Sequence, residues 1–192
     1  MSSTPKFAHV VFQTSRLQAM RDWYCTVLEG HVVHEAGGLC FITFDDEHHR
    51  IGLSSPPIPL QARSPAAAGM HHVAYTFASL DDLLERFAAV EAKGISPKVS
   101  IQHGVTTSLY YQDPDGNYVE MQVDNFATPR ETTDYMQGPE FADDDVGIAF
   151  NPELMREARA GGTPIETLKT RAWAVQTSRP DLPDPVVALT SS

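Results

Sequence analysis

The sequence predicts an α+β protein that is built from two copies of a β-α-β-β-β module. The first observation is an internal repeat, because Ala8-His9-Val10-Val11-Phe12 recurs as His71-His72-Val73-Ala74-Tyr75. The second is that apolar residues at helical spacing follow each copy and end near a glycine, 21 residues after His9 and 22 residues after His72. The third is that three strand-like runs follow each helical pattern.

In the first copy, Thr14 or Ser15 is a cap-like residue that precedes a helical pattern from Leu17 to Leu28. Gly30 is expected to end that helix, as glycines commonly do at helix C-termini. The strand-like runs that follow are His31 to Glu35, Leu39 to Phe44 and His49 to Leu53.

In the second copy, Ser79 precedes a helical pattern from Leu80 to Val90, and Gly94 is expected to end it. Asp113-Pro114-Asp115-Gly116 predicts a tight turn before the last strand, because these residue types favour turns. The strand-like runs of this copy are Ile95 to Ile101, Thr106 to Tyr111 and Asn117 to Val123.

The residues between and after the modules have a different composition. We expect one domain over residues 1–192, with modules at 6–54 and 70–124, an irregular linker at 55–69 that contains Pro65, and a C-terminal arm at 125–192. Within the arm, residues 151–160 have the pattern of a short helix. Residues 180–192 have repeated prolines and no periodicity, which predicts disorder.

Composition excludes several classes of function. The formal net charge is −11, which argues against a nucleic-acid partner, because phosphate contacts need clustered lysine and arginine. The longest apolar runs are too short to cross a bilayer, and Met1 to Lys6 lacks the apolar region of a signal peptide. We therefore expect a soluble cytoplasmic protein with no membrane partner, in which Cys25 and Cys40 are buried thiols.

Three polar residues interrupt strands that are otherwise apolar, namely His9, His72 and Glu120. A lone strand histidine is more often structural, but His9 and His72 occupy equivalent places in the two copies. A glutamate in the middle of an apolar strand is costly unless it is paired or bound to a metal. Two histidines and one carboxylate form a facial ligand set for non-haem iron(II). Strand alternation is expected to turn His71 to the opposite face from His72.

The paired modules resemble the vicinal oxygen chelate superfamily, and within it the small one-domain form of the type I extradiol dioxygenases. The most specific stretch runs from Tyr110 to Glu120, where a strand tyrosine, an Asp-Pro-x-Gly-Asn turn and a terminal glutamate keep the family's spacing. The resemblance covers about residues 6 to 125 well. It implies that the two modules form one cupped mixed β-sheet around a metal site. It also implies that His9, His72 and Glu120 bind iron(II), although manganese(II) suits the same set.

The resemblance also implies roles for three further residues. His49 is similar to a histidine that assists proton removal from a catechol, although His48 is an alternative at that place. His103 is similar to a histidine that hydrogen-bonds bound substrate, and Tyr110 is similar to a tyrosine that contacts a catechol oxygen. The implied reaction is the extradiol cleavage of a catechol-type substrate by O2. Because paired modules expose sheet edges, we also expect a homo-oligomer in which the arm contacts a neighbouring subunit.

Two alternatives stay open at this point. One is another metalloenzyme of the same fold, such as a glyoxalase-like isomerase or an epimerase, which takes a fourth protein ligand from the last strand of the first module. That strand offers His48 or His49 in place of the usual glutamate. The other is a non-catalytic protein that binds an aromatic compound, although such relatives usually lack the complete ligand set.

Overall fold

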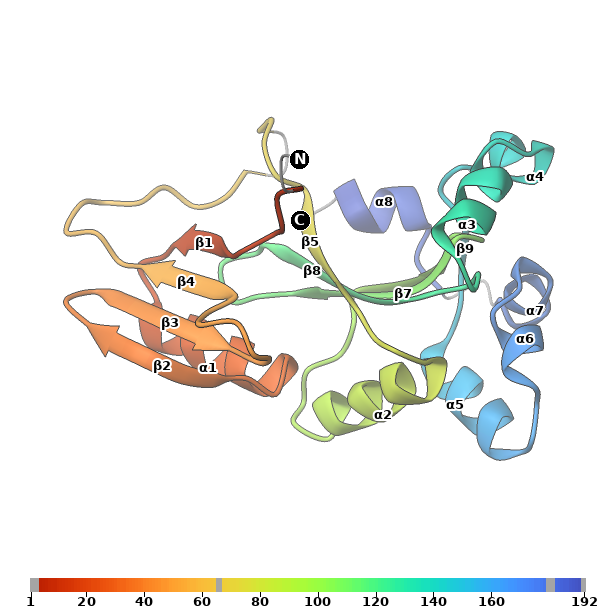
Figure 1. Cartoon of the computed structure of the whole chain (residues 1–192), viewed down its shortest axis with the longest axis horizontal. Helices are drawn as coiled ribbons and strands as arrows, with labels where there is room; N and C mark the ends of the chain where they lie inside the picture. Colours follow the sequence, from red (N-terminus) through yellow and green to blue (C-terminus); the bar gives the residue numbers. More distant parts are fainter. Residues whose placement is uncertain (1–3, 65–66, 179–181, 191–192) are drawn as a thin grey trace. The chain divides into compact units, whose positions relative to one another are not determined.

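The computed structural model describes residues 4–64, 67–178 and 182–190, which divide into two compact units. Unit 1 comprises the chain up to Arg63 together with residues 113–117, and unit 2 comprises the remainder. Each unit contains one β-sheet (Figure 1). The boundary between Arg63 and Ser64 falls inside the predicted linker, of which Pro65 lies outside the described residues. The organisation of residues 1–192 as a single domain stays a prediction.

Unit 1 has the predicted β-α-β-β-β order, and its strands lie in the order β1-β4-β3-β2 with β1 parallel to β4. One face of the helix packs against alternate residues of the strands, such as Ile42, Ile51 and Leu53. The helix residues buried on this face are Met20, Trp23, Tyr24 and Val27. Its elements are β1 (Val10–Gln13), α1 (Leu17–Val27), β2 (His31–Ala36), β3 (Leu39–Thr43) and β4 (Ile51–Ser54).

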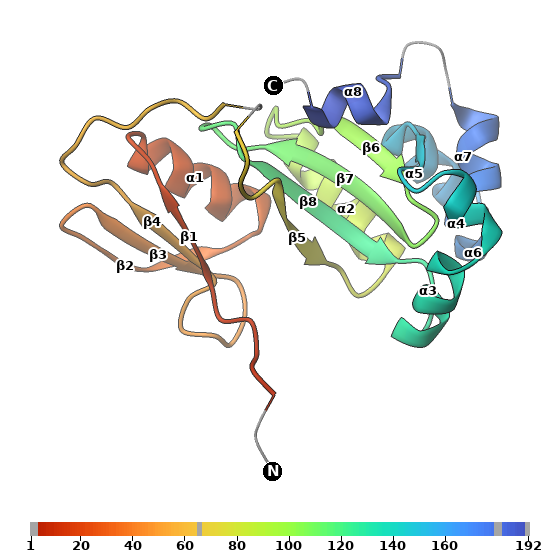
Figure 2. The ribbon, with the colours of Figure 1, turned by 90° about the horizontal axis from the view of Figure 1, so that it is seen from above.

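Unit 2 repeats this order, and its sheet runs β5-β8-β7-β6-β9 with β5 parallel to β8. Helix α2 crosses one face of the sheet (Figure 2) and buries Leu80, Leu83, Leu84, Phe87 and Val90. The module's elements are β5 (His72–Thr76), α2 (Leu80–Glu91), β6 (Val99–Gln102), β7 (Thr106–Gln112) and β8 (Tyr118–Asp124). The repeat that the sequence predicts is therefore confirmed in topology as well as in element order.

Three details of the predicted modules differ from the structure. The described strands form two separate sheets, where the resemblance implies one cupped sheet. Strand β4 begins at Ile51, so His49 precedes it, and the predicted run from Ile95 becomes a strand only at Val99. The first helix is followed by Glu29 in the left-handed region, with φ 55°, and not by the expected glycine. Gly30 is instead needed for close packing, because a Cβ there would lie 2.9 Å from the Thr43 carbonyl oxygen.

Helix starts follow the predicted capping residues in part. The Ser79 hydroxyl accepts a hydrogen bond from the Asp82 amide at 3.1 Å and caps α2 as expected. Helix α1 instead has Arg16 at its N-cap, and the hydroxyl of Thr14, two positions earlier in the chain, accepts from the Arg16 amide at 2.8 Å. Cys40 is buried as expected, whereas Cys25 is half-buried.

The C-terminal arm is more ordered than the sequence predicts. The predicted helix near residues 151–160 is confirmed as α5, and Asn151 caps it. The expectation of disorder over 180–192 is wrong for residues 185–190, which form α8, while 180, 181, 191 and 192 lie outside the described residues. The arm's elements are α3 (Pro129–Met136), α4 (Pro139–Asp143), β9 (Ile148–Ala149), α5 (Pro152–Ala160), α6 (Ile165–Leu168), α7 (Arg171–Thr177) and α8 (Pro185–Thr190).

These arm elements belong to unit 2 and complete its sheet and core. Strand β9 adds an antiparallel edge to β6, and Phe150, Met155, Leu168 and Trp173 are buried behind it. Among the helices that the structure describes, none is long and apolar enough to cross a membrane.

Candidate active site

Unit 2 brings together two of the predicted metal ligands. Glu120 lies in the middle of β8, opposite Ala74 of β5 and Tyr110 of β7, and only 4% of its surface is exposed. His72 is the first residue of β5, and its Nε2 lies 3.0 Å from Oε2 of Glu120. Alternation places both side chains on the face of the sheet opposite α2, because Val119 and Met121 occupy the covered face.

The buried carboxyl of Glu120 is held in its ionised form. Burial alone would raise the pKa of Glu120, but hydrogen bonds from His72, Ser108 and Tyr110 and the charge of His72 outweigh it. The net result is a pKa below the usual value of a glutamate. An anionic, nearly dry carboxylate beside an imidazole nitrogen is a pair of donor atoms suited to a divalent cation.

His103 and Tyr110 form a second pair next to this carboxylate. His103 Nε2 lies 2.9 Å from the Tyr110 hydroxyl, and the His103 Nδ1 donates a hydrogen bond to the Val146 carbonyl oxygen. A carbonyl only accepts, so Nδ1 carries the proton of the neutral ring and the Nε2 lone pair faces the Tyr110 hydroxyl, whose single proton can be donated either to His103 or to Glu120. Burial lowers the pKa of His103, and burial next to the Glu120 charge raises the pKa of Tyr110. The pair is therefore a neutral base that faces a protonated phenol.

The C-terminal arm holds His103 in this orientation. Arg171 donates from Nη2 to the His103 carbonyl oxygen and to the Asp144 carbonyl oxygen, both at 2.6 Å. Gly147 has φ +109°, and a Cβ there would lie 2.8 Å from the His103 Cα and closer still to the Gln102 carbonyl oxygen. This support could not be predicted from the sequence, because the group that Arg171 contacts is the backbone carbonyl of His103, and a residue type does not indicate which backbone carbonyl will be bound.

His71 is also closer to the site than the sequence predicts. Its Nδ1 lies 2.7 Å from the His72 Nδ1, and its ring stacks on Tyr118 with centroids 5.7 Å apart. The expectation that alternation turns His71 away is wrong, because β5 begins only at His72 and alternation holds only inside a strand.

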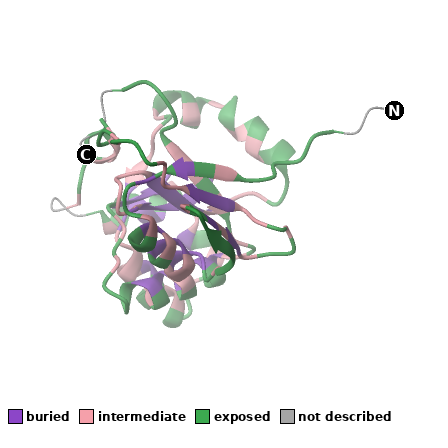
Figure 3. Cartoon of the chain, turned by 90° about the vertical axis from the view of Figure 1, so that its left-hand side faces the viewer, coloured by how far each residue is buried: buried purple, intermediate pink, exposed green. Residues whose placement is uncertain are grey.

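His9 and His49 lie in unit 1, where their rings stack with centroids 4.3 Å apart. His9 directly precedes β1 in the exposed segment 4–9 (Figure 3). His49 is half-buried between His9 and Phe41, and its Nδ1 lies 2.6 Å from the His48 Nδ1. Burial and the neighbouring His9 and His48 lower the pKa of His49, which favours the neutral ring that a general base needs. His48 is more exposed than His49, which favours His49 among the two candidates.

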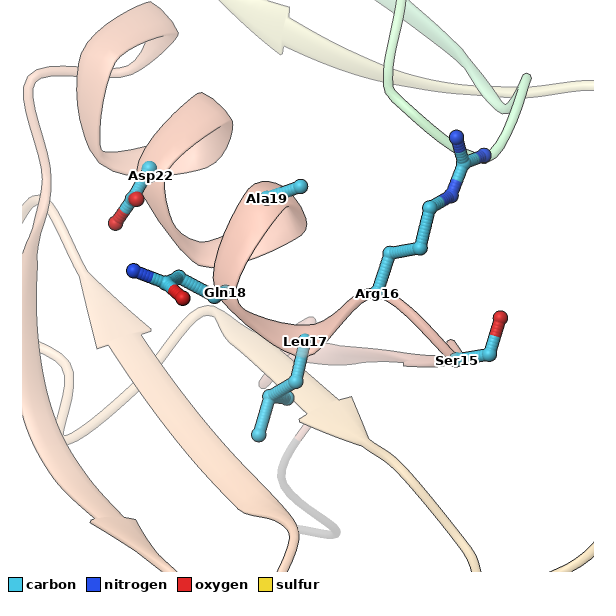
Figure 4. A pocket seen from close by; sticks show the side chains of 6 residues that line it. All are labelled: Ser15, Arg16, Leu17, Gln18, Ala19 and Asp22. Carbon is cyan, nitrogen blue, oxygen red and sulfur yellow. The ribbon is translucent and has the colours of Figure 1, made fainter.

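Neither unit assembles a complete metal site by itself. Within each unit, the described residues contain no group of three His, Cys, Asp or Glu side chains that could hold a metal. An open pocket of about 520 Å³ in unit 1 lies at the start of α1 (Figure 4) and contains none of the predicted site residues. Its lining residues are Ser15, Arg16, Leu17, Gln18, Ala19 and Asp22.

The Asp-Pro-Asp-Gly-Asn turn, which belongs to unit 1, has a structural role. Asp113 accepts hydrogen bonds from the Asp115 and Asn117 amides at 2.9 and 2.8 Å, and from the Tyr24 hydroxyl at 3.0 Å. Burial outweighs these bonds and raises the pKa of Asp113. The Arg16 Nε in Figure 4 donates to Asp115 at 2.8 Å. These hydrogen bonds therefore fix the turn between β7 and β8.

Residues 6–121 match the family model of the Glyoxalase/Bleomycin resistance protein/Dioxygenase superfamily. The chain belongs to this superfamily. It is similar to biphenyl-2,3-diol 1,2-dioxygenase 2 of Rhodococcus globerulus, at 63% identity over the full length of both chains. It is also similar to biphenyl-2,3-diol 1,2-dioxygenase 3 of the same organism, at 52% identity over 93% of this chain and 95% of that protein.

Two of the solved structures that match this chain share its fold. A lactoylglutathione lyase from Agrobacterium tumefaciens matches 64% of this chain and 96% of its own, with a TM-score of 0.51 and 21% identity. A glyoxylase/bleomycin resistance protein/dioxygenase domain from Frankia sp. EAN1pec matches 66% of this chain and 96% of its own, with a TM-score of 0.55 and 15% identity. At these identities the likeness concerns the fold alone.

The strand register shows that the first module has no acidic side chain at the place that Glu120 has in the second module. Val11 pairs with Gly52 in unit 1 as Ala74 pairs with Glu120 in unit 2, so Gly52 stands where the second module has its glutamate. Phe41, opposite Gly52, likewise stands where the second module has Tyr110. The sequence-based expectation that the last strand of the first module carries His48 or His49 is therefore wrong, because both residues precede β4.

Proposed function

We propose that this chain is an extradiol dioxygenase that uses O2 to open the ring of a catechol-type diol at a metal centre. The observation that carries the proposal is the continuous group of His72, Glu120, Tyr110 and His103 on one face of unit 2. It combines two metal-binding donor atoms with an acid/base pair. The names of the two Rhodococcus relatives, both biphenyl-2,3-diol 1,2-dioxygenases, support the same reaction.

The metal is iron(II) in this proposal, and His9, His72 and Glu120 are its ligands. The donor set fits, because an imidazole nitrogen and a carboxylate oxygen 3.0 Å apart match adjacent ligands that are each about 2.1 Å from one ion. His9 is included because the repeat gives it the same place before β1 that His72 has at the start of β5. Manganese(II) suits the same donor types. Bound iron(II) supplies a centre at which a catechol and O2 can exchange electrons.

The chain's own residues manage the protons of the reaction. We propose that His49, a neutral base by virtue of its burial and its histidine neighbours, takes a proton from the catechol. The Tyr110 hydroxyl orients a catechol oxygen, and His103 Nε2 receives and returns a proton through Tyr110. Both atoms of O2 enter the product when the bond beside the diol is broken, so the reaction needs no added reductant.

A glyoxalase-like isomerase is less well supported by the structure. That reading requires a fourth protein ligand from the first module, and Gly52 provides no side chain at the equivalent register position. A non-catalytic binding protein would not need a carboxyl that is buried, ionised and hydrogen-bonded by three side chains.

The experiment that tests the proposal is oxygen uptake by iron(II)-loaded protein with biphenyl-2,3-diol and simpler catechols. We expect one O2 to be consumed for each ring opened, and we expect His103→Phe to lose turnover while it keeps its iron. Iron-loaded protein that consumes no O2 with any catechol would contradict the proposal.

A further inference from the structure

His71 stands between the proposed ligand His72 and α8, all within unit 2. Its Nδ1 lies 2.7 Å from the His72 Nδ1, and its Nε2 lies 3.1 Å from the Leu189 carbonyl oxygen. The last carbonyls of a helix have no backbone partner inside the helix, so the Leu189 carbonyl at the end of α8 can accept from His71. The neighbouring Ala188 carbonyl accepts from the Tyr118 hydroxyl at 2.7 Å in the same way. These hydrogen bonds therefore connect the C-terminal end of α8 to residues next to the proposed site.

The polarity of these contacts fixes which nitrogen of each ring carries a proton. A carbonyl only accepts, so the Nε2 of His71 must donate to Leu189, and the Nδ1 of a neutral His71 then has a lone pair. That lone pair faces His72, so the Nδ1 of His72 must be the donor of their contact. The Nε2 lone pair of His72 is left facing the Glu120 carboxylate at 3.0 Å. A cation must lie between two acceptors this close: without a metal it is a proton, through which His72 hydrogen-bonds Glu120, and a bound metal ion would take the place of that proton.

We propose that His71, set by the Leu189 carbonyl of α8, is a positioning residue that holds His72 in its metal-binding tautomer. This inference rests on the proposed metal site. Metal-binding histidines usually donate their second ring N–H to a fixed acceptor, and removal of that acceptor typically weakens metal binding about 10- to 100-fold. In this chain the acceptor is another imidazole, and its direction is set from the C-terminal helix.

Two substitutions at position 71 separate the two hydrogen bonds. The amide oxygen of an asparagine reaches the place of a histidine Nδ1, so His71→Asn keeps an acceptor for His72 and loses the contact with Leu189. A glutamine amide reaches the place of Nε2, so His71→Gln keeps the contact with Leu189 and removes the acceptor. Both variants lose the stacking on Tyr118 equally, and residue 71 is exposed, so neither change threatens the fold.

The test is the manganese(II) affinity of the full-length variants. Electron paramagnetic resonance measures this affinity from the amount of free ion. We expect His71→Gln to weaken binding about 10- to 100-fold and His71→Asn to stay within about threefold of the parent chain. Equal affinity in both variants, whether retained or lost, would overturn the inference. Two-bond 15N–1H correlation spectra of the parent chain should show the proton of His71 on Nε2, and a proton on Nδ1 would overturn it as well.

Glu120→Gln distinguishes failure of this inference from failure of the metal site. If Glu120→Gln binds manganese(II) as the parent does, the proposed metal site is wrong and the inference falls with it. If Glu120→Gln loses the metal while both position-71 variants bind normally, the site stands and only the role of His71 is wrong.

Discussion

Gly147→Ala should damage both the stability of unit 2 and its proposed chemistry. An alanine at φ +109° is strained by about 1–3 kcal/mol. Its Cβ would also approach the His103 Cα to 2.8 Å and the Gln102 carbonyl oxygen more closely, where real Cβ atoms stay beyond 3.0 Å. Moving the backbone away adds about 1–3 kcal/mol of overpacking. We therefore expect the free energy of unfolding to fall by about 2–6 kcal/mol.

The same movement should separate the Val146 carbonyl from the His103 Nδ1. That hydrogen bond then no longer holds the proton of the neutral His103 ring on Nδ1. We expect kcat/KM with a catechol to fall by about 10- to 100-fold, because part of a general acid–base contribution is lost. Urea unfolding followed by Trp173 fluorescence measures the stability of unit 2. A Trp23→Phe background removes the only other tryptophan, which lies in unit 1.

Gly162→Ala is the matched control in the same arm. Gly162 has φ +94° but nothing lies within 4 Å of its added Cβ, so only the strain of about 1–3 kcal/mol applies. Its activity should equal that of the parent. If Gly147→Ala and Gly162→Ala lose equal stability and neither loses activity, the argument that the arm positions His103 is refuted.

Four further predictions concern the metal ligands, the acid/base residues, the pH dependence and the oligomeric state. His9→Ala, His72→Ala and Glu120→Ala should each lose bound iron on metal analysis after dialysis, and normal iron in Glu120→Ala would exclude the proposed ligand set. His49→Phe and His103→Phe should keep their iron and lose about 10²- to 10⁴-fold in kcat/KM. Tyr110→Phe removes one hydrogen bond, so its kcat/KM should fall about tenfold. Iron missing from His49→Phe would make His49 a ligand. Burial lowers the pKa of His103, so its neutral form persists below pH 6.5 and kcat/KM should fall only as the pH drops through that lowered value; an acid limb centred above pH 6.5 would contradict this. Light scattering at micromolar concentration should show a homo-oligomer, as expected from the exposed sheet edges, and a monomer would count against it.

The module architecture could be predicted because its signals are periodic and local. Apolar residues at helical and strand spacing, the Ser79 cap and the Asp113 turn all act through nearby residues, and the structure has each of them. Strand starts were less predictable. The Thr43 hydroxyl donates to the Glu47 carbonyl at 2.7 Å and holds the loop that carries His48 and His49 outside the strand. No periodicity in the sequence reveals such a contact.

The arm and the supports of the site could not be predicted for a different reason. Helices as short as α6 and α7 are stable only through buried residues such as Leu168 and Trp173, which is a tertiary effect. The partners of His71 and His103 are backbone carbonyls of the arm, and every residue carries one. Residue types therefore indicated His72, Glu120, Tyr110 and His103, but not what orients them.

The fate of labelled dioxygen tests the central claim most directly. Iron(II)-loaded protein supplied with 18O2 and biphenyl-2,3-diol should place both labelled atoms in a ring-opened product that is cleaved beside the diol, as mass spectrometry would show. A product cleaved between the two hydroxyls, a product that carries no label, or intact substrate beside fully iron-loaded protein would contradict the account.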